Sequence, residues 1–163
     1  MVDESGYELK DYKFYTFNGV VKALLIVTDR QSGNTKLDYF DAEYNHLPFT
    51  RGQPNSNKEI PKPKSFEEMK LLVEKLSEGL CEARVDFYDI NGKIYFGEIT
   101  FFPAGGFNPF EPEEWDYTLG SWIQLPKKNR IRGSLLIIPL IPLHKLPQPL
   151  LNTRFRLKSK VRD

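Results

Sequence analysis

Three ionisable residues lie inside a segment that otherwise has the pattern of an ordinary β-hairpin. The segment RVDFYDINGKIYFGEITF, residues 84–101, consists of two apolar stretches on either side of an Asn-Gly pair. Side chains alternate along a strand, so Arg84 and Asp86 share one face. Glu98 and Thr100 share one face of the partner strand. If the two faces coincide, an arginine, two carboxylates and a hydroxyl are gathered in one place.

We expect the turn between the strands to decide whether the two faces coincide. A two-residue turn at Asn91-Gly92 would place Asp86 and Glu98 on opposite faces of the hairpin. A three-residue loop with Gly92 at a bulge would place Arg84 opposite Glu98, with Asp86 as the diagonal neighbour. The sequence leaves both registers open.

Two chemistries follow from these residue types. Two carboxylates on one buried face repel each other, and a divalent cation would offset both the repulsion and the cost of burial. Mg²⁺ takes a few carboxylate oxygens and completes its octahedron with phosphates and water, and an arginine fork suits phosphate. The alternative is a cross-strand ion pair between Arg84 and Glu98, with Asp86 at a wet edge. From the pattern alone, the ion pair is the simpler interpretation.

The elements around this hairpin predict an α+β fold with a mainly antiparallel sheet. Residues 13–27 form a first hairpin around Asn18-Gly19, and residues 37–49 contain one or two short strands. A Pro-rich loop, residues 50–64, precedes a helix. A short second helix is expected near Pro112.

The helix has the clearest sequence signals. Ser65 followed by Glu68 predicts a capping box. Gly79 is placed to take a left-handed conformation after the helix ends. The apolar face at helical spacing consists of Met69, Leu72, Val73 and Leu76.

Composition indicates a globular protein, and the charge distribution sets residues 127–163 apart from the rest of the chain. Forty per cent of the 163 residues are hydrophobic, and the single cysteine, Cys81, excludes an internal disulfide and fits a reducing compartment. Neither a signal peptide nor a transmembrane segment is predicted, so we expect a cytoplasmic protein. Residues 1–126 hold 13 Lys/Arg and 21 Asp/Glu, whereas residues 127–163 hold 10 Lys/Arg and one acid. We therefore expect a folded domain over 1–126 and a poorly ordered basic tail over 127–163.

Five stretches in chain order resemble the TupA-like branch of the ATP-grasp superfamily. They are ELKDYKFYTFNG (8–19), DYFDAEYNHLPF (38–49), KEIPKPKSFEEM (58–69), RVDFYDINGKIYFGEITFFPAGGF (84–107) and PEEWDYTLGSWIQLP (112–126). The resemblance implies the C-terminal α+β subdomain of an ATP- and Mg²⁺-dependent ligase, which joins a carboxylate to an amine through an acyl phosphate. It also implies a carboxylate-bearing sugar or amino acid as substrate, in the synthesis of cell-surface polysaccharide or teichuronopeptide.

The resemblance assigns roles to residues of the second hairpin. It implies that Asp86 and Glu98 are metal ligands, with Thr100 standing where the superfamily usually has asparagine. It implies that Arg84 is the catalytic residue facing the transferring phosphoryl group. The PAGGF loop after the hairpin is expected near the acceptor substrate.

Three further residues are predicted to bind the nucleotide. Lys13 lies on the strand that enters the catalytic half, where a solvated strand lysine is the alternative, and Asp29 and Arg30 end the strand that follows.

The glycine-rich flap and lysine strand of the earlier ATP-grasp subdomain are not recognisable ahead of Lys13. We therefore expect this chain alone to bind nucleotide weakly, without turnover, and a partner chain could supply the missing subdomain. The alternatives are a non-catalytic interaction module and a binder of anionic surfaces through the basic tail; the tail has no spaced aromatic residues for a specific nucleic-acid site.

Overall fold

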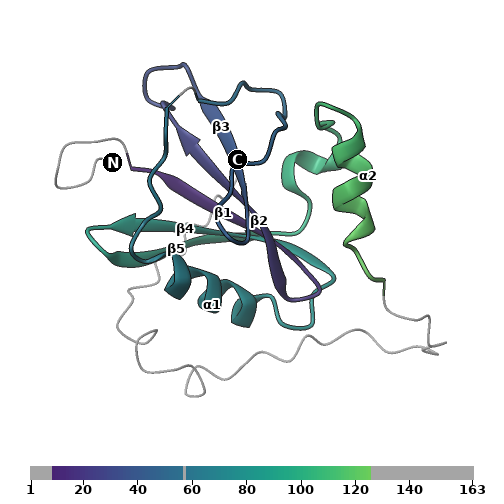
Figure 1. Ribbon diagram of the computed structural model, residues 1–163. Helices are drawn as coiled ribbons and strands as arrows, with labels where there is room; N and C mark the ends of the chain where they lie inside the picture. Colours follow the sequence, from purple (N-terminus) through teal and green to yellow (C-terminus); the bar gives the residue numbers. More distant parts are fainter. Residues whose placement is uncertain (1–8, 57, 126–163) are drawn as a thin grey trace, which may run out of the picture. The chain divides into compact units, whose positions relative to one another are not determined.

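The structure is a computed structural model that describes residues 9–56 and 58–125. Its centre is a five-stranded sheet with the order β3-β2-β1-β4-β5, in which every neighbouring pair is antiparallel (Figure 1). The elements are β1 (Asp11–Phe17), β2 (Val20–Thr28), β3 (Lys36–Asp41), α1 (Phe66–Leu76), β4 (Glu82–Ile90), β5 (Lys93–Thr100), a 3-10 turn (Pro103–Gly106) and α2 (Glu114–Ser121). The predicted α+β class is confirmed. The predicted tail, 127–163, lies outside the described residues.

Both Asn-Gly pairs form two-residue turns. All four residues of Asn18-Gly19 and Asn91-Gly92 have positive φ angles, which is the signature of the tight turn that matches strand twist. Ile90 pairs directly with Lys93 at the second turn. The three-residue loop considered from the sequence therefore does not form.

A β-bulge inside the second hairpin changes its register. Phe87 pairs with Phe96 on the turn side of the bulge, whereas Val85 pairs with Ile99 beyond it. Two residues of β5 therefore stand opposite the single residue Asp86.

This bulge, and not the turn, brings the charged residues to one face. Beyond it, Arg84 pairs with Thr100, so Thr100 and Glu98 face the same side as Arg84 and Asp86. The expectation that the turn alone would decide which residues share a face was wrong. A one-residue shift of register inside the hairpin also moves the side chains of β5 to the opposite face. Gly97 permits the slip, since a Cβ at this position would lie 3.0 Å from the carbonyl oxygen of Asp86.

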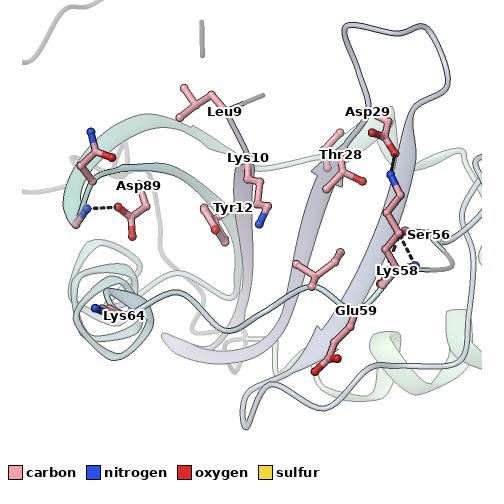
Figure 2. Close-up of a pocket in the computed structure, with 14 residues that line it drawn as sticks. Leu9, Lys10, Tyr12, Thr28, Asp29, Ser56, Lys58, Glu59, Lys64 and Asp89 are labelled. Atoms are coloured by element: carbon pink, nitrogen blue, oxygen red, sulfur yellow. Dashed lines mark hydrogen bonds and ion pairs between the residues drawn. The ribbon is translucent and has the colours of Figure 1, made fainter. Parts of the chain in front are cut away.

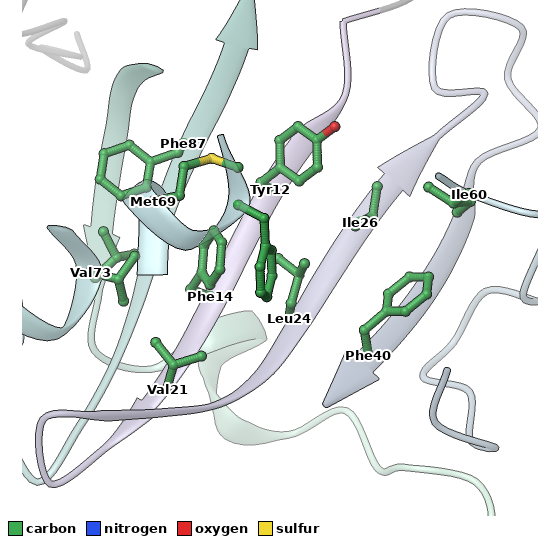
Figure 3. Close-up of a cluster of buried hydrophobic side chains, with 12 residues drawn as sticks. Tyr12, Phe14, Val21, Leu24, Ile26, Phe40, Ile60, Met69, Val73 and Phe87 are labelled. Atoms are coloured by element: carbon green, nitrogen blue, oxygen red, sulfur yellow. The ribbon is translucent and has the colours of Figure 1, made fainter. Parts of the chain in front are cut away.

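Each face of the sheet carries its own hydrophobic cluster. α1 lies across one face, packed against β1, β2 and β4 (Figure 1). The cluster between them includes residues that alternate along the strands, among them Tyr12, Phe14, Leu24, Ile26 and Phe87, with Met69 and Val73 from α1 (Figure 3). The cluster on the other face joins Tyr15, Phe17, Leu25, Tyr39 and Phe49 with Phe110 and with Leu119 of α2. This second face is only partly apolar, and its remaining part carries the charged residues.

α1 begins at the predicted place but is capped differently. Ser65 is the N-cap residue, yet its side chain makes no capping hydrogen bond. Its hydroxyl donates instead to Oδ2 of Asp89, near the β4–β5 turn. The capping box with Glu68 was therefore a wrong prediction, because a tertiary partner takes the serine. Gly79 has φ +79°, which confirms the left-handed position after the helix.

None of the helices over residues 9–56 and 58–125 has both the length and the hydropathy needed to cross a membrane.

Candidate functional site

Five of the predicted residues meet on one face of β1, β4 and β5. β1 and β4 are neighbours, and Lys13 pairs directly with Asp86 across them. The ammonium of Lys13 lies 2.5 Å from Oδ2 of Asp86. Arg84 donates two parallel hydrogen bonds of 2.8 Å to the same carboxylate, from Nε to Oδ1 and from Nη2 to Oδ2. Asp86 is thereby held by two cations from two strands.

Three oxygen atoms converge on a single nitrogen of Arg84. Nη2 lies 2.8 Å from Oδ2 of Asp86, 2.8 Å from Oε1 of Glu98 and 3.0 Å from Oγ1 of Thr100. These oxygens belong to the three residues predicted to bind metal. A guanidinium Nη carries two hydrogens, so three acceptors share two donors there. The point where the three oxygens meet is therefore occupied by a cationic nitrogen whose two hydrogens serve three acceptors.

Burial differs sharply across this group. The side chains of Asp86, Lys13 and Arg84 are 3%, 12% and 14% exposed, whereas that of Glu98 is 63% exposed. Burial by itself would lower the pKa of Arg84, but the hydrogen bonds and charge of Asp86, together with Tyr15 and Glu98, raise that pKa above its usual value. Arg84 is therefore a permanent cation with one buried and one solvent-facing carboxylate.

Sequence reasoning missed one member of the network, Asp11. It alternates with Lys13 on β1, which was the available signal. Its Oδ2 lies 2.8 Å from Nζ of Lys13 and 3.4 Å from Nη2 of Arg30, while its buried Oδ1 has no hydrogen-bond partner among the described residues. Lys13 is thus fixed between Asp11 and Asp86, and Arg30 joins the network through Asp11.

Asp29 does not join this network. It lies 3.7 Å from the ammonium of Lys58 and lines a cavity of about 720 Å³ (Figure 2). The cavity is formed on the α1 side of the sheet, beside Tyr12, where burial and the charge of Asp89 raise the tyrosine pKa to about 12. Its lining has three lysines and three carboxylates: Lys10, Lys58, Lys64, Asp29, Glu59 and Asp89. Asp29 and Arg30, both predicted to bind the nucleotide, therefore have different partners: Asp29 pairs with Lys58 and Arg30 with Asp11.

The PAGGF loop follows the hairpin directly. Phe102, just before the loop, and Phe107, its last residue, have side chains that are mostly exposed. Arg51 holds the loop by donating to the carbonyls of Asn108 and Pro103. The loop thus presents exposed aromatic rings close in sequence to Thr100.

The oxygen atoms of Asp86, Glu98 and Thr100 are the kind of ligand that a hard divalent cation prefers, but one condition must be met before a cation can bind. Among the described residues, no group of three or more His, Cys, Asp or Glu side chains is placed to hold a metal. Asp86, Glu98 and Thr100 provide two carboxylates and a hydroxyl, and Mg²⁺ is commonly bound by one or two carboxylates completed by substrate phosphates. The condition is that Arg84 must leave, because its Nη2 stands where the three oxygens converge.

The comparisons with known proteins agree with the resemblance noted in the sequence. No curated protein and no solved structure matches the chain. The model of the family described as TupA-like ATPgrasp matches residues 1–124 of the 163. Since this match spans well over half of the sequence and all of the charged group, the chain belongs to the TupA-like ATP-grasp family.

Proposed function

We propose that the charged face of β1, β4 and β5 binds the phosphates and magnesium of ATP in a carboxylate–amine ligase. The observation that carries this proposal is the convergence of Asp86, Glu98 and Thr100 oxygens on one cationic nitrogen, with the ammonium of Lys13 on the same carboxylate. Membership of the family supports an ATP-grasp ligase in general.

The residues divide into two roles. Asp86, Glu98 and Thr100 would hold Mg²⁺, which when bound neutralises charge on the transferring phosphoryl group. Arg84 and Lys13 would bind phosphate oxygens, Arg84 through its planar fork and Lys13 as a point charge. Arg30, which is largely exposed, would add positive charge at the rim.

The proposal extends to the acceptor side. The family resemblance favours a carboxylate-bearing sugar or amino acid of cell-surface polysaccharide or teichuronopeptide synthesis. The exposed rings of Phe102 and Phe107, which follow Thr100 in the chain, are compatible with packing against the body of such a substrate.

Binding of Mg-ATP to the full chain tests the proposal. Because a single subdomain is expected to bind weakly, the titration should reach millimolar nucleotide and follow the ³¹P resonances of ATP. We expect Glu98→Gln to weaken binding at least about tenfold, since it removes a charged ligand that lies 2.8 Å from the convergence point. Glu114→Gln on α2 is the matched control, because it removes an exposed carboxylate outside the charged group. Equal binding by Glu98→Gln and the control would contradict the proposed site.

A further inference from the structure

Arg84 stands in the position that a metal ion would take. Its Nη2 is the atom on which the oxygens of Asp86, Glu98 and Thr100 converge. A metal–oxygen distance is about 2.1 Å for Mg²⁺, much shorter than the 2.8–3.0 Å found around Nη2. The guanidinium and the ion therefore exclude each other.

The network around Arg84 is already neutral. Three carboxylates, Asp11, Asp86 and Glu98, are paired with three cations, Lys13, Arg30 and Arg84. A divalent cation alone would add two positive charges to this balanced set and would also have to displace a buried guanidinium. That arginine would then lose its carboxylate partners without gaining another, which is costly for a side chain only 14% exposed.

A metal–nucleotide complex changes this balance. Its phosphates outweigh the charge of its metal, so it brings an anionic partner for the guanidinium in the same step. Phosphate accepts the same parallel hydrogen bonds from an arginine fork that the carboxylate of Asp86 accepts here. Arg84 can then exchange one anion for another without being left unpaired.

We propose that Arg84 acts as a built-in counter-ion that keeps free divalent metal out of the site and gives way only to the metal–nucleotide complex. This inference rests on the proposed function and adds to it the form in which the ligand is accepted. It makes Arg84 a selector between free metal and metal–nucleotide, in addition to its contact with phosphate.

The inference predicts opposite effects of one substitution on two ligands. In Arg84→Gln, the three oxygens lose their resident cation, so Mn²⁺ alone should bind about tenfold to a hundredfold more tightly than to the wild type. Mn-ATP should bind more weakly, because the phosphate fork is gone. Both affinities can be measured by electron paramagnetic resonance of Mn²⁺ with the full chain. Lys75→Gln, which removes an exposed cation from α1 on the other face of the sheet, is the control and should leave the affinity for Mn²⁺ alone unchanged.

A second measurement needs no variant. The Nε proton of Arg84 donates to Oδ1 of Asp86 at 2.8 Å, so its ¹⁵N-detected resonance reports that contact. The resonance should stay unchanged when Mg²⁺ alone is added and should shift when Mg²⁺ is added with ATP.

The outcomes separate the two proposals. If the wild type does not bind Mn-ATP, the proposed function fails. If the wild type binds Mn-ATP but Arg84→Gln binds free Mn²⁺ no better, or if Mg²⁺ alone already shifts the Nε resonance, the selector role is overturned while the nucleotide site stands.

Discussion

Asp86 and Glu98 offer a test of how burial sets the energy of an ion pair. Both carboxylates lie 2.8 Å from Nη2 of Arg84, so distance does not distinguish them. Their exposure does, since the Asp86 side chain is 3% exposed and that of Glu98 is 63% exposed. We predict that Asp86→Ala destabilises the fold much more than Glu98→Ala.

The magnitudes follow from the partners that each substitution leaves behind. Asp86→Ala leaves Lys13 and Arg84 largely buried without their shared carboxylate, and breaking a buried pair costs about 3–5 kcal/mol. The lower end, about 3 kcal/mol, is expected because Asp11 and Glu98 still partner the two cations. Glu98→Ala removes a solvent-screened pair, which contributes about 0–1 kcal/mol.

Urea unfolding of the full chain measures both values. Trp115 and Trp122 pack against the cluster on the same sheet face, so tryptophan fluorescence reports the unfolding of this domain. The shift of the midpoint, at an unchanged slope, gives the loss in the free energy of unfolding. If the two variants lose equal stability within about 0.5 kcal/mol, or if Glu98→Ala loses more, the assignment of energy by burial is refuted.

Three further predictions concern Gly97, Ser65 and Asp41. Gly97→Ala should weaken Mg-ATP binding in the ³¹P titration, because its Cβ would press on the Asp86 backbone at 3.0 Å, whereas Gly120→Ala, which meets nothing within 4 Å, should leave binding unchanged. Ser65→Ala should lower the free energy of unfolding by about 1 kcal/mol, measured by urea unfolding, because its hydrogen bond to Asp89 is lost. Glu68→Ala should lower it by less than about 0.5 kcal/mol, and a larger loss would show that the capping box forms. Burial by itself would raise the pKa of Asp41, but hydrogen bonds from Asn45 and Glu43 outweigh burial and lower that pKa. The ionised Asp41 therefore stabilises the fold above the unfolded-state pKa of about 3.9, and this stabilisation is lost as the pH falls below that value. The stability difference between the wild type and Asp41→Ala should therefore shrink between about pH 5 and pH 2, and a constant difference would argue against this role.

Much of the fold was predictable because its signals are local. An Asn-Gly pair adopts positive φ angles at low cost, so both hairpins could be placed from four residues. The alternation along β4 likewise predicted that Arg84 and Asp86 share a face. The family resemblance then supplied roles for the charged residues, which alternation alone does not do.

The wrong capping prediction came from competition between a local signal and a distant partner. Ser65 had the sequence of a helix cap, but the carboxylate of Asp89 lies within reach only in the folded chain. Asp29 and Arg30 likewise have partners that lie far apart in the sequence, Lys58 for Asp29 and Asp11 for Arg30. No local pattern contains the position of such partners.

The sequence by itself determined the hairpins, the positions of their turns, the helix face and the family, because each depends on short-range spacing or on residues in chain order. Only the tertiary structure decided whether Arg84, Asp86 and Glu98 share a face, because a bulge at Gly97 reverses the sidedness that the Asn91-Gly92 turn establishes. It also decided that Arg84 occupies the point where the three oxygens converge. That position depends on the pairing of β1, β4 and β5, and therefore on contacts between residues that are far apart in the chain.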